Sequence, residues 1–214
     1  MKMKWISTLV LTALFVSQAF SQTPNSKDKD SIPDRKFLVG TTWLSFDNFG
    51  EEKKNIHMYE LHVKYALTPK DRIGVKFTTW NLFQPMGILW WEGIFDKIET
   101  ESEFYPGRLK EIGLGVSYQR MLWKGLFATV EVLPQFKTYL DKDKNKIGSG
   151  FKLYTSYHLG YHISFFKDRM FIEPQIHCNY WPIDTKTPQS FKEIDNRWNN
   201  YFLFEPNLYI GVKF

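Results

Sequence analysis

The sequence contains a single cysteine, Cys178, so no disulfide can form within the chain. Long hydrophobic runs are also missing after the N-terminal segment. No later stretch approaches about 18 uninterrupted apolar residues, and membrane-spanning helices are therefore not expected. The excess of basic residues is small, with a formal net charge of +5, and Lys2 and Lys4 contribute to it from a segment that we expect to be removed. The charge therefore gives no indication of nucleic-acid binding.

The first residues have the pattern of a signal peptide. Two lysines precede an apolar run at residues 5–16, and Ala19 and Ser21 place small residues at the −3 and −1 positions of a cleavage site. We therefore expect residues 1–21 to be a cleaved export signal. Residues 22–35 are polar, which predicts a disordered periplasmic tail, and residues 36–214 are predicted to form one domain.

From residue 36 onward, apolar and polar residues alternate with a period of two, which favours β-strands over helices. In residues 109–122, for example, Leu114 and Val116 share one face while Glu111 and Gly113 share the other. The alternation recurs in residues 151–163, 170–181 and 202–214, and more weakly in 57–67, 72–83 and 126–140, while residues 36–46 are ambiguous in phase. Eight strands are therefore predicted.

The predicted connections between these strands alternate in length. Short connections lie at residues 68–71, 123–125 and 166–169, and long ones at 47–55, 84–107, 141–149 and 182–200. This alternation is typical of outer-membrane proteins, whose short turns face the periplasm and whose long loops face outward. The predicted fold class is therefore all-β, an eight-stranded antiparallel transmembrane β-barrel in the outer membrane, with both termini in the periplasm.

A soluble barrel is the alternative, and it would place the apolar face inside. Small residues on the polar face, such as Gly113, Gly160 and Ser117, argue for a narrow polar lumen instead. Aromatic residues near the strand ends suit the membrane interface, and we expect them to edge the apolar face. They are Trp80, Trp123, Tyr139, Phe165 and Trp181.

Three prolines interrupt this pattern. Pro134, Pro174 and Pro206 fall on the predicted lipid-facing phase, where the missing N–H group implies a bulge or a strand end.

The polar face carries five acidic and five basic residues, which nearly cancel. They are Glu60, Lys64, Lys76, Glu111, Glu131, Lys137, Lys152, Glu173, Glu205 and Lys213. A plug of ion pairs is favoured over a selective pore, because an eight-stranded barrel has room inside only for its side chains. The histidines of this face are His62, His158, His162 and His177. They lack ligand spacing, so hydrogen-bonded lumen histidines are expected rather than a metal site, and no cofactor is predicted.

The last strand, 204–214, ends on the aromatic Phe214 with alternate apolar residues before it. In this respect the chain resembles the small outer-membrane β-barrel proteins of Gram-negative bacteria, the OmpX- and OmpW-like group. The resemblance covers residues 36–214 in pattern. It implies that Phe214 is an assembly signal for the barrel-insertion machinery, and that the membrane partners are outer-membrane lipids.

His162, Ser164 and Glu173 are similar in type to the His/Ser/Glu set of the lipid A deacylases, which are also eight-stranded outer-membrane barrels. A serine nucleophile would need the imidazole as base and the carboxylate to orient it. The predicted topology places His162 and Ser164 at the periplasmic end, on the lumen phase, whereas the deacylases act at the outer leaflet. No catalytic residues are therefore predicted, and the protein is not expected to be an enzyme.

The longest loop gives the one indication of a binding surface. Trp90, Trp91, Ile94 and Phe95 cluster there, ahead of several acidic residues, and such an apolar patch marks an interaction surface unless it packs on the strands. The predicted function is a non-enzymatic outer-membrane barrel with an envelope-structural role or a surface-binding role through its loops. The alternatives are a lipid-modifying enzyme of the deacylase or palmitoyltransferase kind, and a narrow porin-like channel for small apolar solutes.

Overall fold

The computed structural model describes residues 35–49, 57–88 and 104–214. Within these residues the chain forms one antiparallel sheet, a 3-10 helix η1 (Trp43–Phe49) and a short helix α3 (Gln189–Asp195). The strands are β1 (Phe37–Thr42), β2 (Tyr59–Ala66), β3 (Asp71–Leu82), β4 (Arg108–Trp123), β5 (Leu126–Leu140), β6 (Lys146–Tyr161), β7 (Ile163–Phe165), β8 (Met170–Thr185) and β9 (Tyr201–Lys213).

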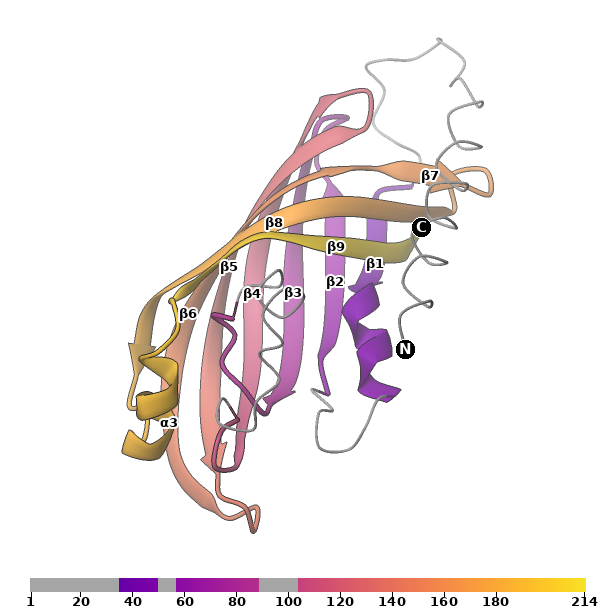
Figure 1. Ribbon diagram of the computed structural model, residues 1–214. Helices are drawn as coiled ribbons and strands as arrows, with labels where there is room; N and C mark the ends of the chain where they lie inside the picture. The colour runs from indigo at the N-terminus through magenta and orange to yellow at the C-terminus, as the bar shows by residue number, and fades with distance from the viewer. Residues whose placement is uncertain (1–34, 50–56, 89–103) are drawn as a thin grey trace, which may run out of the picture. The chain divides into compact units, whose positions relative to one another are not determined.

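The sheet closes on itself (Figure 1). Neighbouring strands follow the order β6-β5-β4-β3-β2-β1-β9-β8, and β8 pairs in turn with β6. Strand β7 continues β6 after a break at His162 and pairs with β8 as well. The described residues therefore form an antiparallel ring of eight strands, which confirms the predicted all-β class and strand number.

The three short connections were located correctly by the sequence. Residues 67–70, 124–125 and 166–169 join β2 to β3, β4 to β5 and β7 to β8 at one end of the ring. Lys124 and Gly125 both have positive φ, 45° and 99°, as a two-residue type I′ hairpin turn requires. We call the end of the ring with these short connections the turn end. The opposite end, which carries the long connections, is the loop end.

Several strand bounds at the loop end differ from the prediction. Strand β1 stops at Thr42 and continues as η1, while β6 begins at Lys146 and β8 extends to Thr185. Helix α3 was not predicted. It follows Pro188 and buries Phe191 and Ile194, which lie three residues apart on one helical face.

Each of the three prolines lies at an irregularity of the ladder. At Pro206 the irregularity is a bulge: Phe204, two residues earlier, has φ of 54°, and the register of β8 with β9 shifts there. At Pro174 the irregularity is in the neighbouring strand, which breaks between β6 and β7. Gly160 pairs with Gln175 and Ile163 pairs with Ile172, but the two residues between them on each strand form no pair in this ladder. The ladder of β4 with β5 has the same two-residue gap beside Pro134.

Candidate functional site

The two faces of the ring differ in polarity, and the apolar face points outward. Buried and exposed positions alternate along β4, where the exposed side chains include Leu114 (67% exposed) and Val116 (62%). Every strand of the ring exposes large apolar groups on this face, for example Phe37, Leu61, Val75, Val116, Val132, Leu159, Ile176 and Val212. The soluble alternative required the opposite arrangement.

The polar phase points inward, and its charges form ion pairs between strands. Glu173 on β8 is fully buried, and its two carboxylate oxygens accept hydrogen bonds from Lys64 Nζ at 3.0 Å and Arg72 Nη1 at 3.4 Å. Gln119 and His162 also bond to Oε1, at 3.3 Å and 2.8 Å. The carboxylate is therefore anchored from four directions, and two cations compensate its charge.

Further ion pairs continue this network through the interior. Lys76 lies 3.0 Å from Glu131 and 3.2 Å from Glu60, and Lys152 lies 2.6 Å from Glu111. The predicted charged positions are buried, except that Glu205, paired with His177, is partly exposed. Arg72 and Asp184, which pairs with Lys137, complete the network but were not among the predicted residues. These pairs agree with the plug interpretation.

The predicted aromatic edge of the outer face is wrong for three residues. Trp80, Tyr139 and Trp181 are buried inside the ring near the loop end, whereas Trp123 is exposed at the turn end. Tyr154 stands edge-on to Trp80, with ring centroids 5.6 Å apart, and stacks on Trp181 at 5.8 Å. The interior toward the loop end thus combines these aromatic rings with the Lys152–Glu111 and Lys137–Asp184 ion pairs.

Helix α3 packs against this aromatic core. Figure 1 shows α3 at the end of β8 away from the C-terminus. Phe191 is fully buried, with its ring centroid 4.8 Å from that of Tyr105 and 4.9 Å from that of Tyr139. The Tyr105 hydroxyl donates a hydrogen bond of 2.5 Å to Asp195. Burial raises the pKa of Asp195, and burial next to the Asp195 carboxylate raises the pKa of Tyr105 well above its ordinary value.

Glycines allow large side chains to fill the interior. A Cβ atom on Gly160 would lie 2.6 Å from the Phe127 ring, and one on Gly211 would lie 2.5 Å from the Phe171 ring. Beside Phe171, Glu173 and Tyr209 the structure has a cavity of about 10 Å³, room for a single water molecule. Small residues on the polar phase therefore serve close packing, as the sequence indicated.

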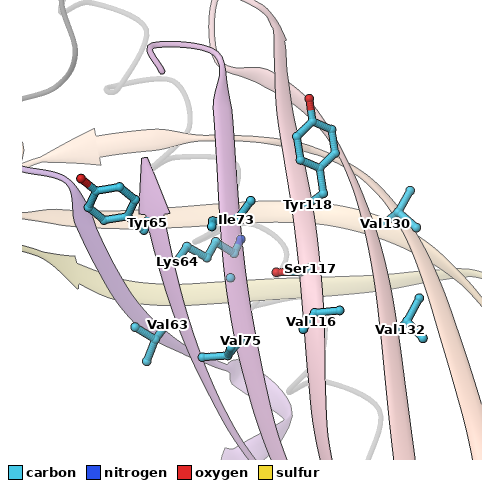
Figure 2. Close-up of a pocket in the computed structure, with 11 residues that line it drawn as sticks. Val63, Lys64, Tyr65, Ile73, Val75, Val116, Ser117, Tyr118, Val130 and Val132 are labelled. Carbon is cyan, nitrogen blue, oxygen red and sulfur yellow. The ribbon is translucent and has the colours of Figure 1, made fainter. Parts of the chain in front are cut away.

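A shallow apolar depression lies on the outer face across β2, β3, β4 and β5 (Figure 2). Its volume is about 650 Å³. One row of paired positions across the four strands consists of valines, Val63, Val75, Val116 and Val132. Tyr65 and Tyr118 border the row on the side of the turn end. Short side chains between longer ones produce the hollow, whose apolar lining suits hydrocarbon.

The structure brings together the three residues that the sequence analysis set aside. His162 lies in the break between β6 and β7, opposite Glu173, and its Nδ1 is 2.8 Å from Glu173 Oε1. Ser164 Oγ is 3.2 Å from His162 Nε2, and Lys213 Nζ donates to the same hydroxyl at 2.6 Å. Their predicted position at the turn end is correct, and Lys213 was predicted on the polar face, but alternation did not show that these side chains contact one another.

The other predicted site residues have different outcomes. Trp90, Trp91, Ile94 and Phe95 lie outside the described residues, as do residues 1–34. Phe214 is exposed at the turn end, and its backbone forms two hydrogen bonds with Phe37, at 2.8 Å and 3.1 Å, across the β1–β9 seam.

The interior histidines do not form a metal centre in the part of the chain that the structure describes. His158 and His177 stand edge to face, with ring centroids 5.2 Å apart. Among residues 35–49, 57–88 and 104–214, no group of three or more His, Cys, Asp or Glu side chains is arranged to hold a metal ion. In the same ranges, no helix is long and apolar enough to cross a membrane.

Comparison with known protein families finds no matching family model, and comparison with curated proteins finds no matching relative.

Proposed function

We propose that residues 36–214 form a β-barrel in the bacterial outer membrane, with the turn end in the periplasm and the loop end outside. The observation that carries the proposal is the inverted polarity of the ring, apolar on the outer face and charged within. Soluble monomers rarely expose contiguous apolar patches larger than a few hundred Å². Hydrocarbon lipid tails are the surroundings in which such an outer face is stable.

Exposed aromatic residues at both ends support this placement. Phe37, Trp123, Phe166 and Phe214 lie exposed at the turn end. Toward the loop end, Tyr59, Phe136 and Tyr201 are exposed on the outer face. Aromatic rings favour the boundary between hydrocarbon and water, so two aromatic zones define an apolar belt between them.

The role of the barrel is an envelope-structural one, with outer-membrane lipids as its partners and loops available to an outside partner. The packed, ion-paired interior favours this role over a channel. Phe214 is exposed beside Phe37, where the first and last strands of the sheet pair. It is therefore accessible to the barrel-insertion machinery, which fits its role as an assembly signal. Trp90, Trp91, Ile94 and Phe95 stay the predicted binding residues of the longest loop.

A charge on the outer face distinguishes a membrane protein from a soluble one. Leu114 lies midway along β4 and is largely exposed. Arginine there costs about 2–4 kcal/mol when the position faces the middle of a bilayer, but almost nothing when it faces water. We therefore expect Leu114→Arg to lower the yield of protein that folds in lipid vesicles and migrates faster unheated than boiled.

Lys110→Arg, a conservative change on the same strand, is the control and should fold like the wild type. If Leu114→Arg folds in vesicles as well as this control, or if the wild type stays in aqueous solution without detergent, the membrane proposal is wrong.

A further inference from the structure

We infer that Ser164 is a catalytic nucleophile, with His162 as its general base and Glu173 as the residue that positions the base, and that the site cleaves carboxylic esters. The inference goes beyond the proposed structural role and departs from the expectation of a non-enzymatic protein. It stands on the hydrogen bonds that join these three side chains at the turn end.

The protonation states follow from the surrounding donors. Lys64, Arg72 and Gln119 all donate to Glu173, so its carboxylate is ionised and can only accept. Arg72 Nη1 also lies 3.4 Å from His162 Nδ1, but the contact of Nδ1 with Glu173 Oε1 is much shorter, at 2.8 Å, and it places the proton on Nδ1. That tautomer leaves the lone pair on Nε2, the atom that faces Ser164 Oγ.

Lys213 makes Ser164 Oγ a hydrogen-bond acceptor. Its ammonium group can only donate, and it donates to Ser164 Oγ at 2.6 Å and to Asp168 at 2.5 Å. The Ser164 hydroxyl keeps its own proton, for which His162 Nε2 and the hydrogen-bonded Asp168 are the two acceptors.

The fold supplies this geometry through the break at Pro174. Because proline lacks an N–H group, the ladder is interrupted opposite it, and the imidazole of His162 turns inward against Phe171, with ring centroids 5.4 Å apart. The His162 and Glu173 side chains are buried, while Ser164 is exposed. Solvent and substrate therefore reach the nucleophile but not the groups that orient it.

The reaction that fits these groups is ester hydrolysis through an acyl-serine. Ser164 Oγ bonds to the carbonyl carbon as its proton passes to His162 Nε2, and His162 then protonates the alcohol as the ester C–O bond breaks. Water then attacks the acyl-serine as it gives a proton to His162. His162 returns that proton to Ser164 Oγ as the bond between Oγ and the acyl carbon breaks and the carboxylic acid leaves. Since the cavity beside the site holds about 10 Å³, the acyl group stays outside the ring, next to exposed Phe166.

The test uses the full mature chain folded in detergent and two probes, a fluorophosphonate label and p-nitrophenyl butyrate. We expect the folded wild type to be labelled and to hydrolyse the ester, and the boiled protein to do neither. Ser164→Ala and His162→Gln should lose both signals by at least about 100-fold. Lys213→Arg should keep part of the activity, because it keeps a charged donor.

Ser156→Ala is the matched control. Ser156 is an interior serine on β6 whose hydroxyl bonds to Asn179 at 2.7 Å, so its loss should leave labelling unchanged. Heat-modifiable migration shows which variants fold, independently of labelling. Should His162→Gln fail to fold, Ser164→Ala alone decides. A folded wild type without label, or a folded Ser164→Ala with undiminished label, overturns the inference.

Discussion

Toward the turn end, the ring is filled by charges: Glu173 is enclosed by Lys64 and Arg72, with His162 and Gln119 completing its hydrogen bonds. Toward the loop end, the same phase of the same strands contributes large rings beside the Lys152–Glu111 and Lys137–Asp184 ion pairs. Trp80, Tyr154 and Trp181 pack together there beneath α3. One closed sheet thus encloses an ionic interior toward the turn end, and an interior of rings and ion pairs toward the loop end.

The two interiors should respond differently to change. A buried ion pair contributes little net stability, but it is costly to break because the partner is left charged and unpaired. An aromatic core loses stability in proportion to the contacts removed, and the rest of the packing stays intact. The turn end should therefore determine whether the ring closes. The aromatic rings of the loop end should determine how firmly helix α3, which we call the cap of this end, is held.

The largest effect is expected for Glu173→Gln. The substitution leaves Lys64 and Arg72 buried without their shared counter-charge, which costs about 3–5 kcal/mol. The denaturant midpoint of the vesicle-folded protein should fall accordingly, measured by tryptophan fluorescence. Glu205→Gln is the control, because that carboxylate is 24% exposed and pairs with His177. An equal loss in both variants would contradict the distinction between the two ends.

The sequence predicted the interior of the turn end better than that of the loop end. The period of two assigned Glu173 and Lys64 to the inner phase, because alternation alone determines the side of a strand. It could not pair them, since they are 109 residues apart and their contact depends on ring closure. The order of strands followed from the alternating lengths of the connections.

The aromatic residues of the loop end were predicted less well. Trp80 and Trp181 suit either a membrane interface or a core, and the side of the sheet on which they lie follows from register and bulges that alternation does not show. The bulge at Phe204 likewise moves Phe202 to the inside. Helix α3 has seven residues, too few for a clear helical period, although Pro188 followed by Phe191 and Ile194 was a usable signal.

A smaller and more local effect is expected for Phe191→Ala. The substitution removes a fully buried ring that contacts Tyr105 and Tyr139, a loss of about 3 kcal/mol at the loop end. Residues 186–200 should then be cleaved faster by added protease, while heat-modifiable migration is retained. Phe191→Leu should restore most of the protection. If Phe191→Ala instead prevents folding, α3 is part of what closes the ring and the two ends are not independent.

The smallest effect is a pH dependence confined to the loop end. Burial raises the pKa of Asp195, so the folded cap binds a proton more readily than the unfolded segment does. The contribution to stability is therefore fully present below the ordinary pKa of an aspartate. It is lost as the pH rises through the raised value. Amide hydrogen exchange in residues 189–195, corrected for its intrinsic pH dependence, should accordingly become slower on acidification. In Asp195→Asn, which keeps an acceptor for the Tyr105 hydroxyl but cannot titrate, the corrected exchange rate should no longer change with pH across this range. The turn end is the internal reference, because Asp195 does not contact it. A pH response that persists unchanged in Asp195→Asn would assign the effect to another group and remove Asp195 from the account of the cap.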